Sequence, residues 1–187
     1  MSQGGRSIVL IGMMGAGKSS VGRCLQRRTG VPCFETDEVV MSRFGIPISE
    51  VFSKYGEGKF REAETQALHE FIAREPAIIV TGGGIVLCEE NINLLKQFGV
   101  VIWLDADEET LLKRALRTGN RPLLEGKNPT KTFVETLRAR LPRYAKTADI
   151  KIDTSALTAE EVAVAILSKL ARYYRKLPGS TIPATEP

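Results

Sequence analysis

Residues 12–19 carry the strongest chemical signal in the chain, because Gly-Met-Met-Gly-Ala-Gly-Lys-Ser matches the pattern G-x-x-x-x-G-K-[ST]. The three glycines can take backbone angles that side chains forbid, so consecutive amide N–H groups can point at one anion. The helix that follows adds its positive N-terminal end. In such a loop Lys18 reaches the β- and γ-phosphates of a nucleoside triphosphate, and the Ser19 hydroxyl ligates Mg2+. The pattern therefore predicts phosphoryl-transfer chemistry.

A second group of reactive side chains, Glu35-Thr36-Asp37-Glu38, follows the second expected strand. Ligands of open parallel sheets bind beyond the carboxyl ends of the strands, so carboxylates here would face the mouth of the phosphate loop. One of them could accept a proton from an attacking hydroxyl or hold Mg2+ through water. Asp37 is an equally good N-cap for the following helix, and the residues themselves do not choose between these roles.

Two later segments could recognise a phosphoryl acceptor. Arg61 lies in Gly-Glu-Gly-Lys-Phe-Arg-Glu-Ala-Glu, residues 56–64, and an arginine fork suits a carboxylate. The local sequence alone favours a solvated helix on which Arg61 pairs with Glu57 or Glu64. The three glycines of residues 82–84 follow a buried strand and would allow the backbone to approach a ligand closely.

Apolar runs of strand length alternate with helical patterns along the chain, which predicts an α/β fold with a parallel sheet. The expected strands are residues 6–11, 33–35, 77–81, 100–104 and 150–153. The expected helices are residues 18–29, 37–44, 49–55, 59–73, 89–97, 111–116, 132–144 and 158–174. Residues 12–19 thus join the first strand to the first helix, which is the context that a phosphate loop requires.

Several boundaries have recognisable signals. Gly30 is the expected C-cap of the first helix, Ser49 an expected N-cap, and Thr158 with Glu161 an expected capping box. Residues 117–131 are rich in Gly, Pro, Asn and charge, and they are long enough to form an active-site lid. We expect one domain at residues 1–177, with a disordered tail at residues 178–187.

The composition is that of an ordinary globular chain, with 43% hydrophobic and 26% charged residues among 187. The net charge of +4 is spread without a long Lys/Arg block, which argues against a nucleic-acid-binding protein. Three scattered cysteines argue against a disulfide framework or a zinc site and favour a reducing compartment. Because neither a membrane-spanning run nor a signal peptide is recognisable, we expect no membrane partner and a cytoplasmic location.

Taken together, these motifs resemble those of the shikimate kinase family. The motifs that carry the resemblance are residues 12–19, the Asp37 carboxylate, Gly56-Glu57-x-x-Phe60-Arg61-x-x-Glu64, Thr81-Gly82-Gly83-Gly84, Arg121-Pro122-Leu123-Leu124, Arg140-x-Pro142-x-Tyr144 and Ile152-Asp153-Thr154. They stand in the order of the family and span about residues 7–170. The resemblance implies ATP-dependent phosphorylation of the shikimate 3-hydroxyl, on the route to chorismate and the aromatic amino acids. It also implies a P-loop, nucleoside-monophosphate-kinase-like fold, a three-layer α/β/α arrangement with a five-stranded parallel sheet of order 2-3-1-4-5.

For the acceptor, the resemblance implies that Asp37 binds the shikimate hydroxyls and acts as the base. Arg61 and Arg140 would clamp the substrate carboxylate, and Gly83 and Gly84 would line the site. This set is complementary to a small ring that bears one carboxylate and three hydroxyls. The two guanidinium groups suit the carboxylate, and the aspartate can accept hydrogen bonds from the hydroxyls.

For the nucleotide, the resemblance implies that Lys18 and Arg121 neutralise charge, with Arg121 arriving as the lid closes. Arg117 would lie near the adenine, and the loop after Asp153 would pack on the other side of that base. Lys18, Asp37 and Arg121 are thus the expected catalytic residues. The implied ATP-binding residues are Gly12, Met14, Gly15, Ala16, Gly17, Lys18, Ser19, Ser20, Arg117 and Arg121.

The metal site departs from the family pattern. The cofactor Mg2+ would be held by Ser19, with Glu35 and Asp37 as further candidates acting through water. The family usually has Asp-x-Asp where this chain reads Glu35-Thr36-Asp37, so the first acid is one methylene longer. Asp105 imitates the acid at the end of a Walker B strand, but the resemblance places that segment at residues 78–84. Asp105 or Asp107 is therefore expected to be a helix cap.

Three alternatives share the phosphate loop. A gluconate kinase also acts on a carboxylate with hydroxyls, but the Gly-Gly-Gly and Arg-x-Pro-x-Tyr segments disfavour it. A nucleoside-monophosphate kinase has less use for a carboxylate clamp at Arg61. A catalytically silent regulator would not need Lys18, Ser19, Asp37 and Arg121 together. The expected partners are therefore shikimate and ATP, and the resemblance implies a monomer.

Overall fold

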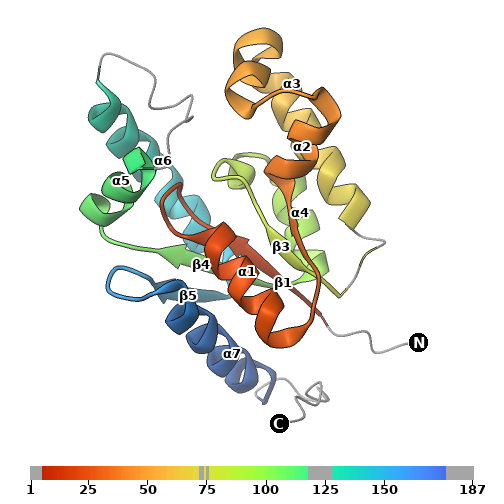
Figure 1. Ribbon diagram of the computed structural model, residues 1–187, viewed down its shortest axis with the longest axis vertical. Helices are drawn as coiled ribbons and strands as arrows, with labels where there is room; N and C mark the ends of the chain where they lie inside the picture. The colour runs from red at the N-terminus through yellow and green to blue at the C-terminus, as the bar shows by residue number, and fades with distance from the viewer. Residues whose placement is uncertain (1–5, 72–73, 75, 118–127, 176–187) are drawn as a thin grey trace.

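Short runs of aliphatic residues form one five-stranded parallel sheet in the computed structural model of the chain, which describes residues 6–71, 74, 76–117 and 128–175 (Figure 1). The strands are β1 (Ser7–Ile11), β2 (Cys33–Glu35), β3 (Ile78–Val80), β4 (Gly99–Asp105) and β5 (Ile150–Asp153). Their order in the sheet is β2-β3-β1-β4-β5. The predicted fold class and strand order are therefore confirmed.

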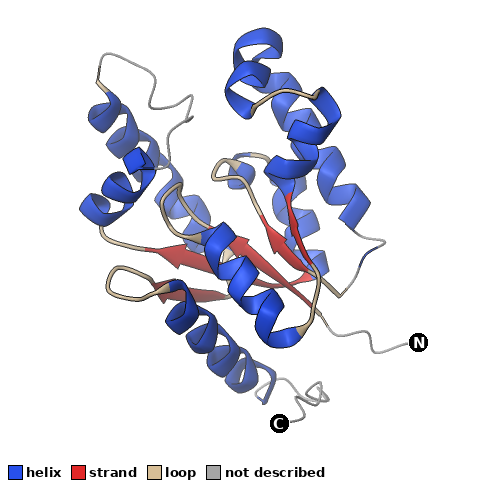
Figure 2. Ribbon diagram, viewed as in Figure 1, coloured by secondary structure: helices blue, strands red, loops and turns tan. Residues whose placement is uncertain are grey.

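Helices connect the strands and lie on both faces of the sheet (Figure 2). They are α1 (Lys18–Thr29), α2 (Thr36–Phe44), α3 (Ile48–Phe71), α4 (Glu89–Phe98), α5 (Glu108–Arg117), α6 (Pro129–Thr147) and α7 (Ala159–Arg175), with a short 3-10 helix η2 (Ile85–Leu87). Helices α1 and α7 pack side by side on one face, whereas α4 and α6 contact β4 from the other. No helix in the described ranges is both long enough and apolar enough to cross a membrane.

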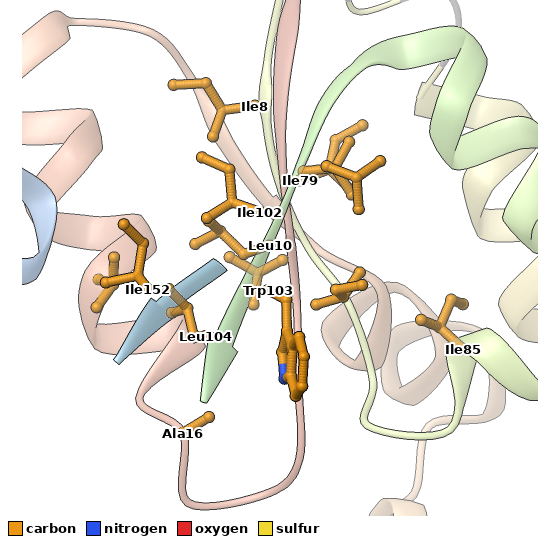
Figure 3. Packing of buried hydrophobic residues seen from close by; sticks show 14 of the residues in the cluster. Ile8, Leu10, Ala16, Ile79, Ile85, Ile102, Trp103, Leu104 and Ile152 are labelled. Atoms are coloured by element: carbon orange, nitrogen blue, oxygen red, sulfur yellow. The ribbon is translucent and has the colours of Figure 1, made fainter. Parts of the chain in front are cut away.

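The core lies between these layers because side chains alternate between the two faces of each strand. Figure 3 shows Ile8, Leu10 and Ile102 on one side of the sheet and Ile79 on the other. Trp103 points to the second face, where its ring stacks on Tyr144 of α6 at a centroid distance of 5.9 Å. Residues of β1 and β4 are almost fully buried, which explains their continuous apolar runs. The end of β1 is thus a rigid support for the loop that follows it.

A separate apolar cluster holds α2 and α3 together above the sheet. Val40, Val51, Phe60 and Ala63 are buried in it, and the rings of Phe52 and Phe60 lie 4.5 Å apart. Gly56 breaks the helical geometry of α3 with φ 79° and ψ 168°, between the two helices expected at residues 49–55 and 59–73. Figure 1 shows α2 and α3 on one side of the loop after β1, and α5 and α6 on the other.

Most predicted boundaries agree with the structure to within a few residues. Gly30 is the C-cap of α1, with φ 69° and its N–H donating to Gln26 O. The capping box of Thr158 and Glu161 is also present. The Ser49 N-cap was wrong, because α3 begins one residue earlier, at Ile48.

The predicted lid and tail fall mostly outside the described residues. Of the lid predicted at residues 117–131, Arg117 is the last residue of α5, and residues 129–131 belong to the first turn of α6. Residues 118–127, which include Arg121, and residues 178–187 lie outside the described ranges.

Candidate functional site

One pocket of about 560 Å³ lies where the loop after β1 faces helices α2, α3, α5 and α6. Most of the predicted site residues line it, although they come from distant parts of the chain. These are Met14, Gly15, Ala16, Gly17, Lys18, Ser19, Ser20, Glu35, Asp37, Arg61, Gly83, Gly84, Arg117 and Arg140. Gly12 lies against the backbone of β4, where a Cβ would come within 2.2 Å of Leu104 O. The remaining candidate, Arg121, is outside the described residues.

The phosphate loop has the backbone geometry that its glycines predicted. Gly15 and Gly17 have φ of 85° and 89°, in the left-handed region that favours glycine. The Lys18 ammonium folds over the loop and donates to Gly12 O at 2.8 Å and Met13 O at 3.1 Å. Gly17 is followed directly by α1, so the positive end of that helix and the ammonium face the same space.

Oxygen ligands for a divalent cation lie at the mouth of this loop. The Ser19 hydroxyl donates to Glu35 Oε2 at 2.6 Å, and Arg23 Nη1 lies 3.5 Å from Glu35 Oε1. Glu35, the longer acid at this position, therefore contacts the serine directly. A hydroxyl beside a carboxylate is the hard-oxygen donor set that Mg2+ prefers, with phosphate oxygens completing it. Within the described ranges, no cluster of three His, Cys, Asp or Glu residues provides a separate metal cage.

Arg61 forms both ion pairs that its helix spacing allowed, and it also lines the pocket. Its Nε and Nη2 donate to Glu57 Oε1 at 3.2 and 3.0 Å, while its Nη1 donates to Glu64 Oε2. The two interpretations of Arg61 are therefore not exclusive. Glu57 is exposed, with 61% of its side chain accessible, whereas Glu64 is fully buried. An incoming carboxylate can displace the exposed partner while the buried one keeps the guanidinium in place.

Glu64 and Asp37 bring two carboxyl groups to one point beside Gly82. A Cβ on Gly82 would lie 2.5 Å from Glu64 Oε1 and 2.7 Å from Asp37 Oδ1. Burial raises the pKa of Glu64 to about 7, and the Asp37 carboxylate adds to this rise against the opposing effect of Arg61. Asp37 is not the N-cap of α2, because that helix begins at Thr36 and its N-cap position is Glu35.

The glycines of residues 82–84 make room for the protein's own side chains. A Cβ on Gly84 would lie 2.3 Å from Arg61 Nη2 and 2.5 Å from Nη1. Neither Gly82 nor Gly84 has a positive φ, so space and not backbone conformation requires glycine there. The sequence interpretation expected a close approach to a ligand, but in this structure Arg61, Glu64 and Asp37 occupy the space beside these two glycines.

Helix α6 supplies the second arginine from the far side of the pocket. Arg140 is 6% exposed, and its Nη1 lies 3.9 Å from Met13 Sδ and 3.6 Å from the position of a Cβ on Gly83. One helical turn further on, Tyr144 donates its hydroxyl to Gly83 O at 2.5 Å. Burial raises the pKa of Tyr144 to about 12, so the phenol stays neutral and remains a donor. Tyr144 thereby ties α6 to the glycine segment on which Arg61 rests.

The two acids at the end of β4 and just after it have structural roles. Asp107 Oδ1 accepts from Thr110 N at 2.8 Å and caps α5, as one of the two expected alternatives. Asp105 pairs with Lys151 Nζ at 2.7 Å. Several pocket residues were absent from the predicted site, among them the charged residues Glu64 and Arg114. The sequence presented Glu64 as an ion-pair partner of Arg61 and as part of a family motif, without a role in the site. Arg114 carried no local signal because its partners, Thr154 and Ser155, lie 40 and 41 residues away.

Known shikimate kinases match this chain over nearly its whole length. Residues 14–171 match the shikimate kinase family model. The chain is 43% identical to shikimate kinase of Thermodesulfovibrio yellowstonii over 89% of this chain and 96% of that protein. It is 44% identical to that of Moorella thermoacetica, over 91% and 98%. A structure of shikimate kinase from Acinetobacter baumannii in complex with shikimate superposes with a TM-score of 0.86 at 36% identity, covering 92% of this chain and 95% of that one.

Proposed function

The chain belongs to the shikimate kinase family, and from this premise we propose how its pocket transfers the γ-phosphoryl group of ATP to the 3-hydroxyl of shikimate. The observation that carries the proposal is the placement of two arginines and an aspartate opposite the phosphate loop in one pocket. Phosphoryl transfer needs mainly positioning and charge neutralisation. One half of the pocket binds the phosphoryl donor, and the other half binds the acceptor.

In the donor half, residues 12–20 bind the phosphates of ATP. Backbone amides and the end of α1 hold the chain of phosphates, and Lys18 leaves its carbonyl partners to contact the β- and γ-phosphates. Ser19 would hold Mg2+, and Glu35, which accepts a hydrogen bond from the Ser19 hydroxyl, and Asp37 are further candidates that would act through water. When bound, Mg2+ neutralises charge on the phosphate oxygens.

In the acceptor half, Arg61 and Arg140 bind the carboxylate of shikimate, with Gly83 and Gly84 lining the site. The guanidiniums come from α3 and α6, so they can hold the acid from two sides. Asp37 binds the ring hydroxyls and accepts the proton of the 3-hydroxyl as its oxygen attacks the γ-phosphorus. The bond from that phosphorus to the bridging oxygen breaks, and ADP leaves with its electron pair.

The lid completes the donor half. Arg117 lies at the end of α5 and lines the pocket, where we place it near the adenine. Arg121 is the lid arginine of this proposal and approaches the phosphates when the lid closes, which limits transfer to water. We further propose that the protein acts as a monomer in the cytoplasm.

The decisive assay follows ADP release while shikimate, gluconate and AMP are offered in turn. We expect ADP release with shikimate and only background release with the other two. Release with gluconate or AMP but not with shikimate would overturn the assignment. Release without any acceptor at the same rate as with shikimate would indicate an ATPase and would contradict it as well.

Substituting Gly84→Ala is expected to raise the KM for shikimate about tenfold, which corresponds to the loss of roughly one charge-assisted hydrogen bond. The added methyl group would overlap the Arg61 guanidinium, and this flexible end of a side chain must move away. The KM for ATP should remain within about twofold, because the phosphate loop is untouched.

Gly58→Ala is the matched control for this substitution. It adds the same methyl group within α3, where a Cβ would meet nothing within 4 Å. Steady-state kinetics with each substrate varied in turn measures both constants. A Gly84→Ala enzyme with an unchanged KM for shikimate would show that the position of Arg61 is unimportant.

A further inference from the structure

Thr36 lies between two acids of the pocket, Glu35 and Asp37, but does not line the pocket itself. It is the first residue of α2, and its side chain is fully buried. Its Oγ1 accepts a hydrogen bond from Gly82 N at 2.9 Å. A hydroxyl at the start of a helix usually accepts from an amide of that helix, whereas this one accepts from a different element. The Thr36 side chain therefore joins the start of α2 to the glycines of residues 82–84.

Gly82 is a fixed point for this contact, because the central strand of the sheet holds the residue before it. Thr81 N and Thr81 Oγ1 both donate to Leu10 O of β1, at 3.2 and 2.9 Å. Gly82 O accepts from Ile85 N of η2 at 3.2 Å. The amide that donates to Thr36 is thus attached to the core of the fold.

The two neighbours of Thr36 are held in different ways. Glu35 is the last residue of β2 and is held by the pairing of β2 with β3. Asp37 belongs to α2, which packs on α3 in the separate apolar cluster. Apolar packing is non-directional, whereas a hydrogen bond sets both a distance and a direction. The bond from Gly82 to Thr36 therefore fixes the start of α2 in a way that this packing does not.

The carboxylate of Asp37 lies against the same glycine. A Cβ on Gly82 would lie 2.7 Å from Asp37 Oδ1, so the N–H of this glycine is held by Thr36 while its Cα faces the next side chain along α2. A change in the first contact must therefore change the second. A misplacement of about 1 Å at a reacting group can cost about 100-fold in rate.

We propose that Thr36 is a positioning residue for Asp37, because its buried hydroxyl holds the start of α2 against Gly82 and so sets where the base meets the acceptor hydroxyl. The inference rests on the proposed function for the role of Asp37. Thr36 lies outside the pocket lining, so its effect should pass through Asp37 and should not reach the phosphate loop.

The test is a double-mutant cycle on kcat, with ADP release followed at saturating ATP and shikimate. Thr36→Val keeps the shape of the residue and removes the hydroxyl, and we expect it to lower kcat about tenfold, with the KM for ATP within about twofold. Thr36→Ser keeps the hydroxyl and should retain kcat within about threefold. In an Asp37→Ala background, the added Thr36→Val should change kcat less than about twofold, because the residue that it positions is already gone.

The same four proteins of the cycle are compared for the dissociation constant of shikimate by titration calorimetry, which needs no turnover. Thr36→Val should weaken shikimate binding about threefold in the parent enzyme and less than about 1.5-fold beside Asp37→Ala. Thr36→Ala is the second variant without the hydroxyl if Thr36→Val does not fold, and the same losses are expected.

Ser7→Ala is the matched control. Ser7 is 1% exposed, and its Oγ accepts from Ala77 N at 3.0 Å, so this contact also joins a buried hydroxyl to a backbone amide. It lies at the start of β1, the end of the strand opposite the phosphate loop. The variant should lower the temperature of thermal unfolding about as much as Thr36→Val does, and it should leave kcat unchanged.

Three results would overturn the proposal: a parent-like kcat in a folded Thr36→Val enzyme, a Thr36→Ser enzyme as slow as Thr36→Val, or a full additional loss beside Asp37→Ala. The second of these would show that the methyl group and not the hydroxyl is required. A failure of the proposed function would appear in the parent enzyme as a lack of ADP release with shikimate, whereas a failure of this inference would appear only in the variants.

Discussion

The Lys18→Ala enzyme is expected to lose about 1,000-fold or more in kcat, because its ammonium is the charged side chain of the phosphate loop itself. In the structure the Nζ atom is held at 2.8 Å from Gly12 O, within the space that the phosphates enter. Charge develops on the transferring oxygens during the reaction, and a fixed positive charge there stabilises the transition state more than the ground state. The effect should therefore fall mainly on kcat.

The measurement is the rate of ADP release at saturating ATP and shikimate. Lys96→Ala provides the matched control, since it removes an exposed lysine from α4, which does not line the pocket. Thermal unfolding of both variants should be close to that of the parent enzyme. A near-normal kcat for Lys18→Ala, with the fold retained, would show that the loop does not bind the reacting phosphates as proposed.

Replacement of Arg61 by alanine is expected to raise the KM for shikimate about 100-fold or more, with little change in the KM for ATP. Truncating one partner of a buried, hydrogen-bonded charge pair typically costs about 2–5 kcal/mol, which is roughly 30- to 5,000-fold. The fully buried Glu64 would also lose its cation, which lowers the free energy of unfolding and is a separate effect from the rise in KM. We expect the pKa of Glu64, already raised by burial to about 7, to rise further in this variant.

Two further variants separate the substrate contact from the internal ion pair. Arg61→Lys retains a positive charge for Glu64 but loses the planar fork, so the KM for shikimate should still rise clearly. Arg43→Ala serves as the control, because Arg43 of α2 also pairs with a carboxylate of α3, Glu70 at 2.5 Å, but in a more exposed position outside the pocket. Equal losses for ATP and shikimate in Arg61→Ala would contradict the carboxylate clamp.

The donor half of the site was predictable because its parts are contiguous. Residues 12–20 form a loop and a helix start directly after β1, so contiguous residues place the amides and Lys18. The parallel sheet was also predictable, since alternating strand and helix patterns leave few other arrangements. Helix ends marked by Gly30 or by Thr158 with Glu161 depend on local hydrogen bonds and were found for the same reason.

The acceptor half was less predictable because its residues come from separate elements. Spacing within α3 indicated that Arg61 could pair with Glu57 or Glu64, and the structure shows both pairs. The same guanidinium also lines the pocket, where it lies against Gly84. Spacing within α3 could not indicate this, because it depends on how α3 packs against the rest of the fold. The resemblance to a family named these positions, but it did not show that Gly82 and Gly84 are small to admit Asp37, Glu64 and Arg61.

By itself, the sequence determined a phosphate loop on a parallel α/β sheet, since both follow from neighbouring residues and from periodicity along the chain. The tertiary structure alone decided which charges meet. It buried Glu64 beside Asp37 and Arg61, and it joined Arg114 to Thr154 across 40 residues. The physical reason is that backbone conformation is set largely by local sterics and hydrogen bonding, whereas burial and the pairing of charges depend on through-space packing of distant elements.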